Sequence, residues 1–196
     1  MNDSREHILR TAFSLFTSKG YKAVTMQDLE NATKLTKGAF YHYFKSKEEL
    51  FQAVIEKYYL SSYPHFVAED FDSLEAFIQA HVSNIQEKLV LMKGCGDNSL
   101  PDPYYLRLIL EAKKHFPALG EKIKEIFRDQ MNQWESIIVK AKNKGEIKKN
   151  VDASILAESF TSVGLGIIKN MILDDSVELA LLKIKIQFEQ LYCLLK

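Results

Sequence analysis

The chain has 196 residues, of which 46% are apolar and 27% are charged, and its 26 basic residues equal its 26 acidic ones in number. This is the composition of a globular protein with a substantial core, and the balanced charge excludes a uniformly basic coat for nucleic acid. The N-terminus lacks the apolar segment of a signal peptide and charged residues interrupt the longest apolar run, which predicts a cytoplasmic protein without a membrane span.

Apolar residues recur at helical spacing along the whole chain, and this pattern predicts an all-α fold of about nine helices. The first four helices are expected to begin at Asp3 or Ser4, at Thr25, at Thr36 and at Ser46, because these side chains can cap a helix N-terminus. Gly20 is expected to end the first helix, and Pro64 to follow the fourth. The apolar face of the second helix is expected to be Met26, Leu29 and Ala32. Five more helices are expected at residues 72–93, 103–115, 117–144, 152–173 and 175–196.

The short third helix has two unlike sides. Because a helix advances about 100° per residue, one side of residues 36–44 carries Phe40, Tyr43 and Phe44, and the other carries Lys37, Gly38, Tyr41, His42 and Lys45. No acidic residue occurs from Thr33 to Lys47, so the second side forms a local positive patch on a neutral chain. This patch predicts a polyanionic partner, and Gly38 leaves room for another backbone. Two helices joined by a short turn, the second exposing such a face, form a helix-turn-helix motif.

The segment TMQDLENATKLTKGAFYHYFKSKEELF, from Thr25 to Phe51, resembles the DNA-binding signature of the TetR family of bacterial transcriptional regulators. The preceding ILRTAFSLFTSKGYKAVT is similar to the family's first-helix pattern. The resemblance covers about the first quarter of the chain, and the remainder matches only in length and helical character. It implies a three-helix DNA-binding domain of residues 1–47 and a larger helical ligand-binding and dimerisation domain of residues 48–196.

The resemblance also implies roles for individual residues. Thr25 and Gln27 would approach the DNA from the second helix. Thr36 and Lys37 would lie at the start of the recognition helix, and Gly38 and Ala39 would lie close to base edges. Tyr41 and His42 would contact the sugar-phosphate backbone, and Lys47 would bind a phosphate. The chain departs from the family at Lys34, where many relatives have glycine in the turn. Lysine is mildly unfavourable in a left-handed conformation, so we assign no base contact to this turn.

The last two helices are apolar on nearly every side, so each has to be buried on more than one side. A monomer of this size would have difficulty burying both. We therefore expect a two-fold homodimer in which these helices pair with their copies as a four-helix bundle, as the family does. Such a dimer would place two recognition helices about 34–36 Å apart and would bind a near-palindromic operator on double-stranded DNA.

The middle helices carry many large aromatic residues, and some of these could line an apolar pocket for a small-molecule effector. The candidates are Tyr59, His81, Tyr105, Trp134 and Phe160, and for each of them a place in the core is the alternative. No histidine or cysteine has metal-ligand spacing, and both Cys95 and Cys193 are expected to be free thiols, so the sequence predicts no metal site and no cofactor.

Two other functional classes stay open at this point. One is a helical small-molecule-binding or scaffold protein without specific DNA binding. In such a protein the positive patch around Lys37 and Tyr41 would have no function. An enzyme would need a catalytic motif, but the sequence has no HExxH, P-loop, GxGxxG or GxSxG and no base marked as a partner for Cys95. The sequence identifies neither the effector nor the operator, and it does not separate repression from activation.

Overall fold

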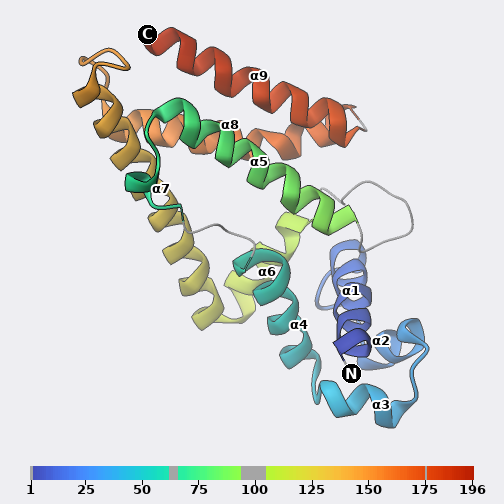
Figure 1. Cartoon of the computed structure of the whole chain (residues 1–196). Helices are drawn as coiled ribbons and strands as arrows, with labels where there is room; N and C mark the ends of the chain where they lie inside the picture. Colours follow the sequence, from blue (N-terminus) through green and yellow to red (C-terminus); the bar gives the residue numbers. More distant parts are fainter. Residues whose placement is uncertain (1, 62–65, 94–104, 175) are drawn as a thin grey trace. The chain divides into compact units, whose positions relative to one another are not determined.

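The computed structural model describes residues 2–61, 66–93, 105–174 and 176–196, and within these ranges it is helical without any strand (Figure 1). This confirms the all-α prediction. The helices are α1 (Asn2–Lys19), α2 (Met26–Thr33), α3 (Lys37–Tyr43), α4 (Lys47–Ile55), α5 (Leu74–Lys93), α6 (Tyr105–His115), α7 (Pro117–Lys144), α8 (Ala153–Asp174) and α9 (Val177–Leu195). Two shorter helical turns lie between α4 and α5: a π-helical turn at Glu56–Leu60 and a 3-10 turn at Ala68–Asp70.

The helix ends follow the capping residues. Thr25 caps α2 in a capping box with Asp28, and the hydroxyls of Thr36, Ser46 and Ser176 cap α3, α4 and α9. Gly20 ends α1 with φ 84° and Gly145 follows α7 with φ 74°, a left-handed conformation that favours glycine. These ends agree with those expected from the sequence. The start expected at residue 103 lies outside the described residues.

The fourth helix was expected to be one α-helix up to the residues before Pro64, and this expectation was wrong in its last turns. The α-helical hydrogen bonding of α4 ends at Ile55, and Glu56–Leu60 continue as a π-helical turn. Tyr58 and Tyr59 in this turn are buried, at 2% and 6% exposure. The rings of Tyr58 and Phe13 pack at a tilt of 36°, with centroids 4.4 Å apart, beside the wider turn.

The chain forms two compact units, Met1–Tyr63 with Val90–Lys124, and Pro64–Leu89 with Glu125–Lys196. The first unit therefore contains α1 to α4 and α6, and the second contains α8 and α9 with most of α5 and α7. The domain boundary at residue 47 stays a prediction about which segment folds and acts on its own.

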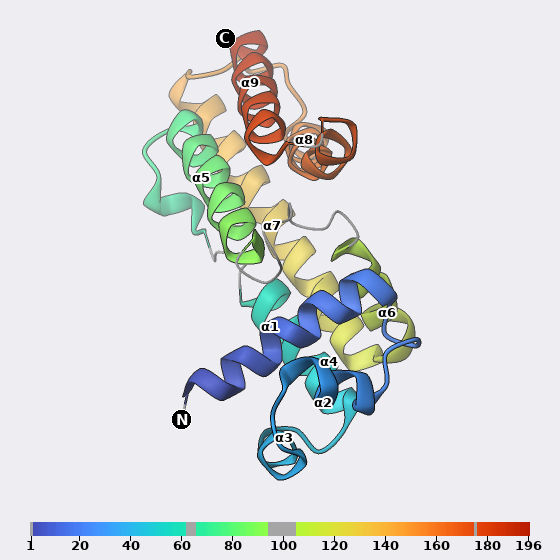
Figure 2. The same ribbon diagram turned by 90° about the vertical axis from the view of Figure 1, so that its right-hand side faces the viewer.

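The core of the first unit is built by one side of α1 packing on α2 and α4 (Figure 2), and the buried Phe40 of α3 belongs to the same unit. The residues of this core are at most 6% exposed and include Ile8, Leu9, Ala12, Phe13, Phe16, Leu29, Phe40, Phe44, Leu50 and Phe51. The face expected for α2 was wrong at Ala32, which is exposed. Thr33 takes the buried position instead, and its hydroxyl donates to the Glu30 carbonyl oxygen at 2.9 Å, which satisfies its polar atom inside the core.

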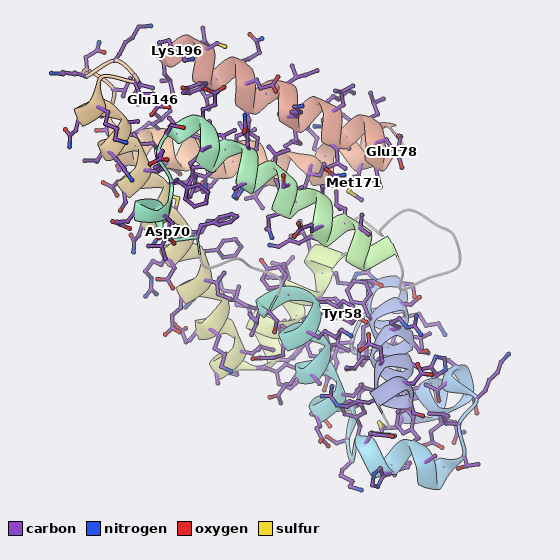
Figure 3. All side chains as sticks on the ribbon, in the orientation of Figure 1. Tyr58, Asp70, Glu146, Met171, Glu178 and Lys196 are labelled. Carbon is purple, nitrogen blue, oxygen red and sulfur yellow. The ribbon has the colours of Figure 1, made fainter. Side chains whose placement is uncertain are left out.

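In the second unit α8 and α9 lie side by side, and the views in Figures 1 and 2 agree on this. Glu146, in the connection between α7 and α8, joins three segments of this unit (Figure 3). Its carboxylate accepts hydrogen bonds from the backbone N–H groups of Leu74 at 3.0 Å and Glu75 at 3.2 Å, and from the Tyr192 hydroxyl at 2.8 Å. One acid thus satisfies two orphan donors at the start of α5 and fixes the end of α9.

Candidate nucleic-acid interface

Helix α3 is held to its unit by one side only. Phe40 and Phe44 are 0% and 2% exposed and anchor that side, while Lys37, Gly38, Ala39 and His42 are exposed on the other. The Thr36 hydroxyl, also exposed, accepts a hydrogen bond from the Ala39 N–H at 3.3 Å and fixes the start of the helix. The sequence had separated these two sides by their helical angle alone.

Gly38 lies at the centre of the exposed side. A Cβ atom built on Gly38 would have no heavy atom within 4 Å, so nothing in the fold itself requires glycine there. The space above this backbone is open to solvent. Glycine lowers the stability of a helix, and Gly38 has no neighbour in the fold that would require it. A glycine at such a position is expected where the backbone of another molecule approaches the helix closely.

Tyr41 is half-buried and bridges the two helices of the motif. Its hydroxyl donates a hydrogen bond to the Glu30 carboxylate on α2, and this bond raises the pKa of Tyr41 above its usual value, with partial burial adding to the effect. The Lys37 amine lies 5.8 Å from the centre of the Tyr41 ring, and the Lys45 amine donates to the Tyr41 carbonyl oxygen. Tyr41 is therefore surrounded by the charges of the proposed DNA-binding face.

Glu30 was missed in the sequence analysis. The sequence could have indicated only that α2 carries an acid on a partly exposed face. Pairing that acid with Tyr41, eleven positions later, needs the angle between the two helices. The recognition face therefore contains a negative charge that a search for basic residues alone does not find.

The two candidates on α2 are exposed and have partners within their own helix. The Thr25 hydroxyl donates to Asp28 Oδ2 at 2.6 Å, and Gln27 Nε2 donates to Asn31 Oδ1 at 3.1 Å. The two Thr25 hydrogen bonds lower the pKa of Asp28. Both contacts are local, so both side chains remain at the surface where the resemblance places them near DNA. Their contact with DNA stays a prediction.

Lys47 is half-buried and its amine bonds to the protein's own backbone. It donates to the carbonyl oxygens of Tyr21 at 3.0 Å and Val24 at 2.9 Å, and it lies 4.4 Å from the centre of the Tyr21 ring. Lys47 therefore holds the connection between α1 and α2 against the start of α4. The phosphate contact that the resemblance implies for it stays a prediction.

The turn between α2 and α3 accommodates the departure from the family pattern. Lys34 has φ 56° and ψ 20°, and it is the one non-glycine residue with positive φ in the described part of the chain. A lysine in this conformation costs roughly 1–2 kcal/mol relative to the right-handed region. Lys34 thus takes the left-handed conformation itself, in a turn where many relatives have glycine.

Three of the five candidate ligand residues come together in the second unit. The Trp134 ring stacks on Phe160 at 4.7 Å, and His81 meets Trp134 edge-on at 5.1 Å. All three are at most 5% exposed, and Gly164 lets α8 approach so closely that an added Cβ would lie 3.4 Å from His81 Nε2. These contacts are those of a packed aromatic core. The ligand-binding role of the three residues stays a prediction.

Buried polar atoms distinguish this core from a purely apolar one. Trp134 Nε1 and Asn170 Nδ2 are buried without a hydrogen-bond partner among the described residues. Burial, with a contribution from the Lys88 charge, lowers the pKa of His81 to about 3, and burial also lowers the pKa of Lys88 to about 7. His81 is therefore neutral at physiological pH.

The other two candidates belong to the first unit. Tyr59 lies in the π-helical turn and lines a cavity of about 10 Å³ with residues of α1, α4 and α6, too small to hold more than about one water molecule. Tyr105 is the first residue of α6. Their assignment to a ligand site stays a prediction.

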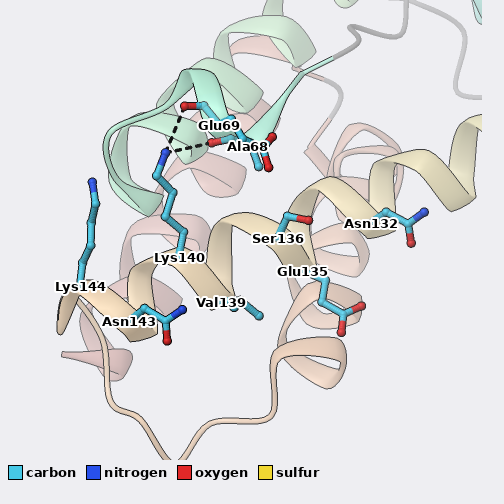
Figure 4. A pocket seen from close by; sticks show the side chains of 9 residues that line it. All are labelled: Ala68, Glu69, Asn132, Glu135, Ser136, Val139, Lys140, Asn143 and Lys144. Carbon is cyan, nitrogen blue, oxygen red and sulfur yellow. Dashed lines mark hydrogen bonds between the residues drawn. The ribbon is translucent and has the colours of Figure 1, made fainter.

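A groove of about 710 Å³ runs along one face of α7 beside the 3-10 turn (Figure 4). Lys140 closes one side of it, because its amine donates to the carbonyl oxygens of Glu69 at 3.1 Å and Phe71 at 2.6 Å. Most of the residues that line it have polar side chains, although these also expose apolar atoms: Ala68, Glu69, Asn132, Glu135, Ser136, Val139, Lys140, Asn143 and Lys144. These bonds from Lys140 hold the 3-10 turn against α7, so the groove has a structural explanation.

Across the helices that the structure describes, none is both long and apolar enough for a transmembrane segment.

Comparison with known proteins supports the motif found here. Residues 8–54 match the family model described as bacterial regulatory proteins, tetR family, and residues 71–181 match the tetracyclin repressor-like C-terminal domain. The second match alone covers more than half of the chain.

Three individual proteins illustrate the similarity. The uncharacterised HTH-type transcriptional regulator YerO of Bacillus subtilis is 43% identical over 58 residues, which are 30% of this chain and 20% of that protein. The HTH-type transcriptional repressor NemR of Escherichia coli is 38% identical over 58 residues, 30% of this chain and 29% of NemR. The chain therefore aligns with less than a third of each relative. A crystal structure of a TetR transcription regulator from Haloarcula marismortui, 16% identical, has a TM-score of 0.66 and covers 100% of this chain and 99% of that one, which shows the same fold.

Proposed function

Since the chain belongs to the TetR family of bacterial regulatory proteins, we propose that it is a ligand-responsive transcriptional repressor in the cytoplasm. In this proposal it binds a near-palindromic operator on double-stranded DNA as a homodimer. One observation carries the proposal: α3 buries Phe40 and Phe44 and leaves Lys37, Gly38 and His42 bare on its opposite side.

The proposed DNA contacts divide by chemistry. Lys37 and Gln27 are the side chains able to make paired hydrogen bonds to base edges, and Gly38 and Ala39 let the helix backbone approach the groove. Thr25, Thr36, Tyr41, His42 and Lys47 would contact phosphates or sugars. Lysine contacts to phosphate release counterions from the DNA. The affinity for DNA should therefore fall steeply as the salt concentration rises, and it should do so for every base sequence.

The proposed dimer rests on an apolar surface of α8 and α9. Large apolar side chains remain between 41% and 72% exposed there: Ile155, Leu165, Leu173, Leu179, Leu182, Ile186 and Leu194. Several exposed large apolar side chains on two neighbouring helices are typical of a protein–protein interface. A second copy of the chain is the occupant we propose, because a four-helix bundle of α8, α9 and their copies would bury this surface and set the spacing of two recognition helices.

The proposed effector site is the aromatic core of the second unit, around His81, Trp134 and Phe160. The buried Trp134 N–H without a described partner supports it, because such a donor is stabilised by an acceptor that a ligand could bring. Coupling would then follow from linkage. A ligand that favours dimers with misplaced recognition helices weakens DNA binding, and DNA weakens ligand binding by the same factor. In this proposal, α4 and the π-helical turn that continues it transmit the conformational change between the ligand site and the DNA-binding helices.

The first test is selection of bound duplexes from a random pool, followed by a titration of the selected operator with Lys37→Ala. We expect Lys37→Ala to weaken binding at least tenfold and to reduce the slope of log affinity against log salt by about one. Lys149→Ala removes an equal charge from an exposed position before α8 and should change neither quantity. Equal affinities of wild type and Lys37→Ala would contradict the assignment of this face.

The same experiment separates the alternatives. A helical ligand-binding or scaffold protein would select no sequence and would show no salt-dependent affinity for duplex DNA. An enzyme would consume a metabolite added during the titration, which mass spectrometry of the mixture would detect. The effector is expected to be the metabolite that releases the operator and is recovered unchanged.

A further inference from the structure

The turn between α2 and α3 has a hydrogen bond from a residue of α1. The Thr33 carbonyl oxygen lies 2.9 Å from His7 Nε2, and because a carbonyl oxygen can only accept, His7 Nε2 donates this bond. Thr33 is 2% exposed and His7 is half-buried. Thr33 ends α2, and the last four carbonyl groups of a helix have no α-helical partner of their own. His7 therefore supplies the acceptor at the end of α2 with a donor from another helix.

The same carbonyl group belongs to the strained part of the turn. The Thr33 C=O and the Lys34 N–H form one planar peptide unit, and the φ rotation of Lys34 starts from this plane. Lys34 has φ 56°, a conformation that a lysine rarely adopts. Within the turn itself, the Lys34 N–H donates to the Asn31 carbonyl oxygen at 3.4 Å, which is longer than an ordinary N–H···O bond. The bond from His7 is the shorter of these two, and both hold the same peptide plane.

The first turns of α1 also touch the far end of the recognition helix. The Arg5 guanidinium lies 5.5 Å from the centre of the ring of Phe44, the C-cap residue of α3. Helix α1 therefore contacts the last residue of α2 and the residue that follows α3. Three residues, 34–36, separate the two helices of the motif, so the conformation of this turn sets the angle between them.

We propose that His7 is a positioning residue for DNA binding: its bond to the Thr33 carbonyl holds Lys34 in the left-handed conformation and thereby fixes the angle between α2 and the recognition helix. This inference rests on the proposed DNA-binding function and adds to it a residue that contacts no DNA. Without the bond, the peptide plane can rotate and Lys34 relaxes toward a less strained conformation. Lys37 of α3 and Gln27 of α2 then no longer meet the base edges of one site together. Phosphate contacts are the same for every base sequence and are less sensitive to this angle.

The test compares His7→Leu, which removes the donor at similar side-chain volume, with His7→Gln, whose amide Nε2 can donate in its place. Affinity is measured by fluorescence anisotropy on the selected operator and on a scrambled duplex of the same length. We expect His7→Leu to bind the operator about tenfold more weakly and to bind the scrambled duplex within about twofold of wild type. The slope of log affinity against log salt should be unchanged, because no phosphate contact is removed. His7→Gln should restore most of the operator affinity.

Lys34→Gly provides the second arm, because glycine adopts the left-handed conformation without steric cost. In the Lys34→Gly background, His7→Leu should lose less than half of the binding free energy for the operator that it loses in the wild type. An equal loss in both backgrounds would show that His7 does not act through this turn and would overturn the proposal. Equal weakening on the operator and the scrambled duplex would also overturn it, and so would a His7→Gln variant as weak as His7→Leu. All measurements are made well below the thermal unfolding midpoint of the least stable variant, so that folded proteins are compared.

These outcomes remain separate from failure of the proposed function. If the wild-type protein selects an operator and His7→Leu keeps the wild-type ratio of operator to scrambled-duplex affinity, only the inference about His7 is wrong. If the wild-type protein binds neither duplex at any salt concentration, the proposed function is wrong and the inference fails with it.

Discussion

Tyr21 shows how one residue fixes the DNA-binding motif to its unit. Its N–H donates to Glu111 Oε2 of α6 at 2.6 Å, and its hydroxyl donates to Glu48 Oε1 of α4 at 2.9 Å. Its carbonyl accepts from Lys47, and its ring packs on Phe51 at 4.6 Å. The connection between α1 and α2 therefore has direct bonds to both α4 and α6. A shift of α6 would therefore act directly on this connection through the bond to Glu111.

The Tyr21 hydroxyl predicts a loss of stability in alkaline solution. Burial and the hydrogen bond to Glu48 raise the pKa of Tyr21 from 10.0 to about 12. A group with a raised folded pKa contributes its stability fully below its unfolded pKa, and that contribution disappears as the pH rises toward the folded value. The free energy of unfolding should therefore fall as the pH rises from about 10 to about 12.

Urea unfolding of wild type and Tyr21→Phe across this range checks the prediction. Tyr21→Phe should be less stable than wild type below about pH 10, by roughly 1 kcal/mol for the lost hydrogen bond, and its stability should decline less steeply above that pH. The remaining decline includes Tyr192, whose pKa is also raised by burial and by its bond to Glu146. Parallel curves for the two proteins would show that Tyr21 does not titrate as expected.

At the scale of helices, single side chains decide where each element begins. Thr36 starts α3 at the position that leaves Lys37 and Gly38 outside, and Asp152 starts α8 with two backbone bonds of 3.0 Å that lower the pKa of its carboxyl group. Helix α5 has in addition a distant partner, since Glu146 bonds to its first N–H groups. The start of α5 therefore depends on the end of α7 as well as on its own Ser73.

This dependence predicts that Glu146→Ala destabilises the protein by about 2 kcal/mol, because it leaves donors of α5 and the Tyr192 hydroxyl without their acceptor. Glu146→Gln keeps one acceptor oxygen and should lose about half as much. The denaturant midpoint of each variant measures the effect, with Glu135→Ala on the exposed side of α7 as the control. A midpoint for Glu146→Ala equal to that of the control would mean that these bonds are replaced by water at no cost.

For the whole molecule, the main question is what covers α8 and α9. Leu179, Leu182 and Ile186 form a stripe along α9 and are between 41% and 52% exposed, in a chain whose other helices bury most of their large apolar residues. A second copy of the chain would explain this exposure, and it would also provide the paired recognition helices that a near-palindromic operator needs.

Charges introduced into this stripe are predicted to separate the dimer. Leu182→Glu with Ile186→Glu would bury four unpaired carboxylates across a two-fold interface, which should weaken association at least about 100-fold. Light scattering after gel filtration should then show monomers, and operator affinity should fall in parallel. Val139→Glu changes an apolar residue of similar exposure on α7 and should leave the dimer intact. A dimer that survives the double substitution would place the interface elsewhere.

The sequence by itself determined the features that depend on near neighbours along the chain. Capping residues and left-handed glycines fixed the helix ends, because their hydrogen bonds reach three or four positions. Helical periodicity separated the Phe40 side of α3 from the Lys37 side. The prediction failed at Ala32 and at the π-helical turn, where burial by other helices and the packing of Tyr58 override local preference.

Only the tertiary structure decided which side chains satisfy one another across helices. It bonded Lys47 to the connection after α1, paired Glu30 with Tyr41, and packed Trp134 against Phe160, 26 positions later in the sequence. The physical reason is that such contacts depend on the distance and angle between helices, and these are set by the packing of all core residues at once. The recognition helix could therefore be found from its own residues, whereas the partners of Lys47 and Trp134 could not.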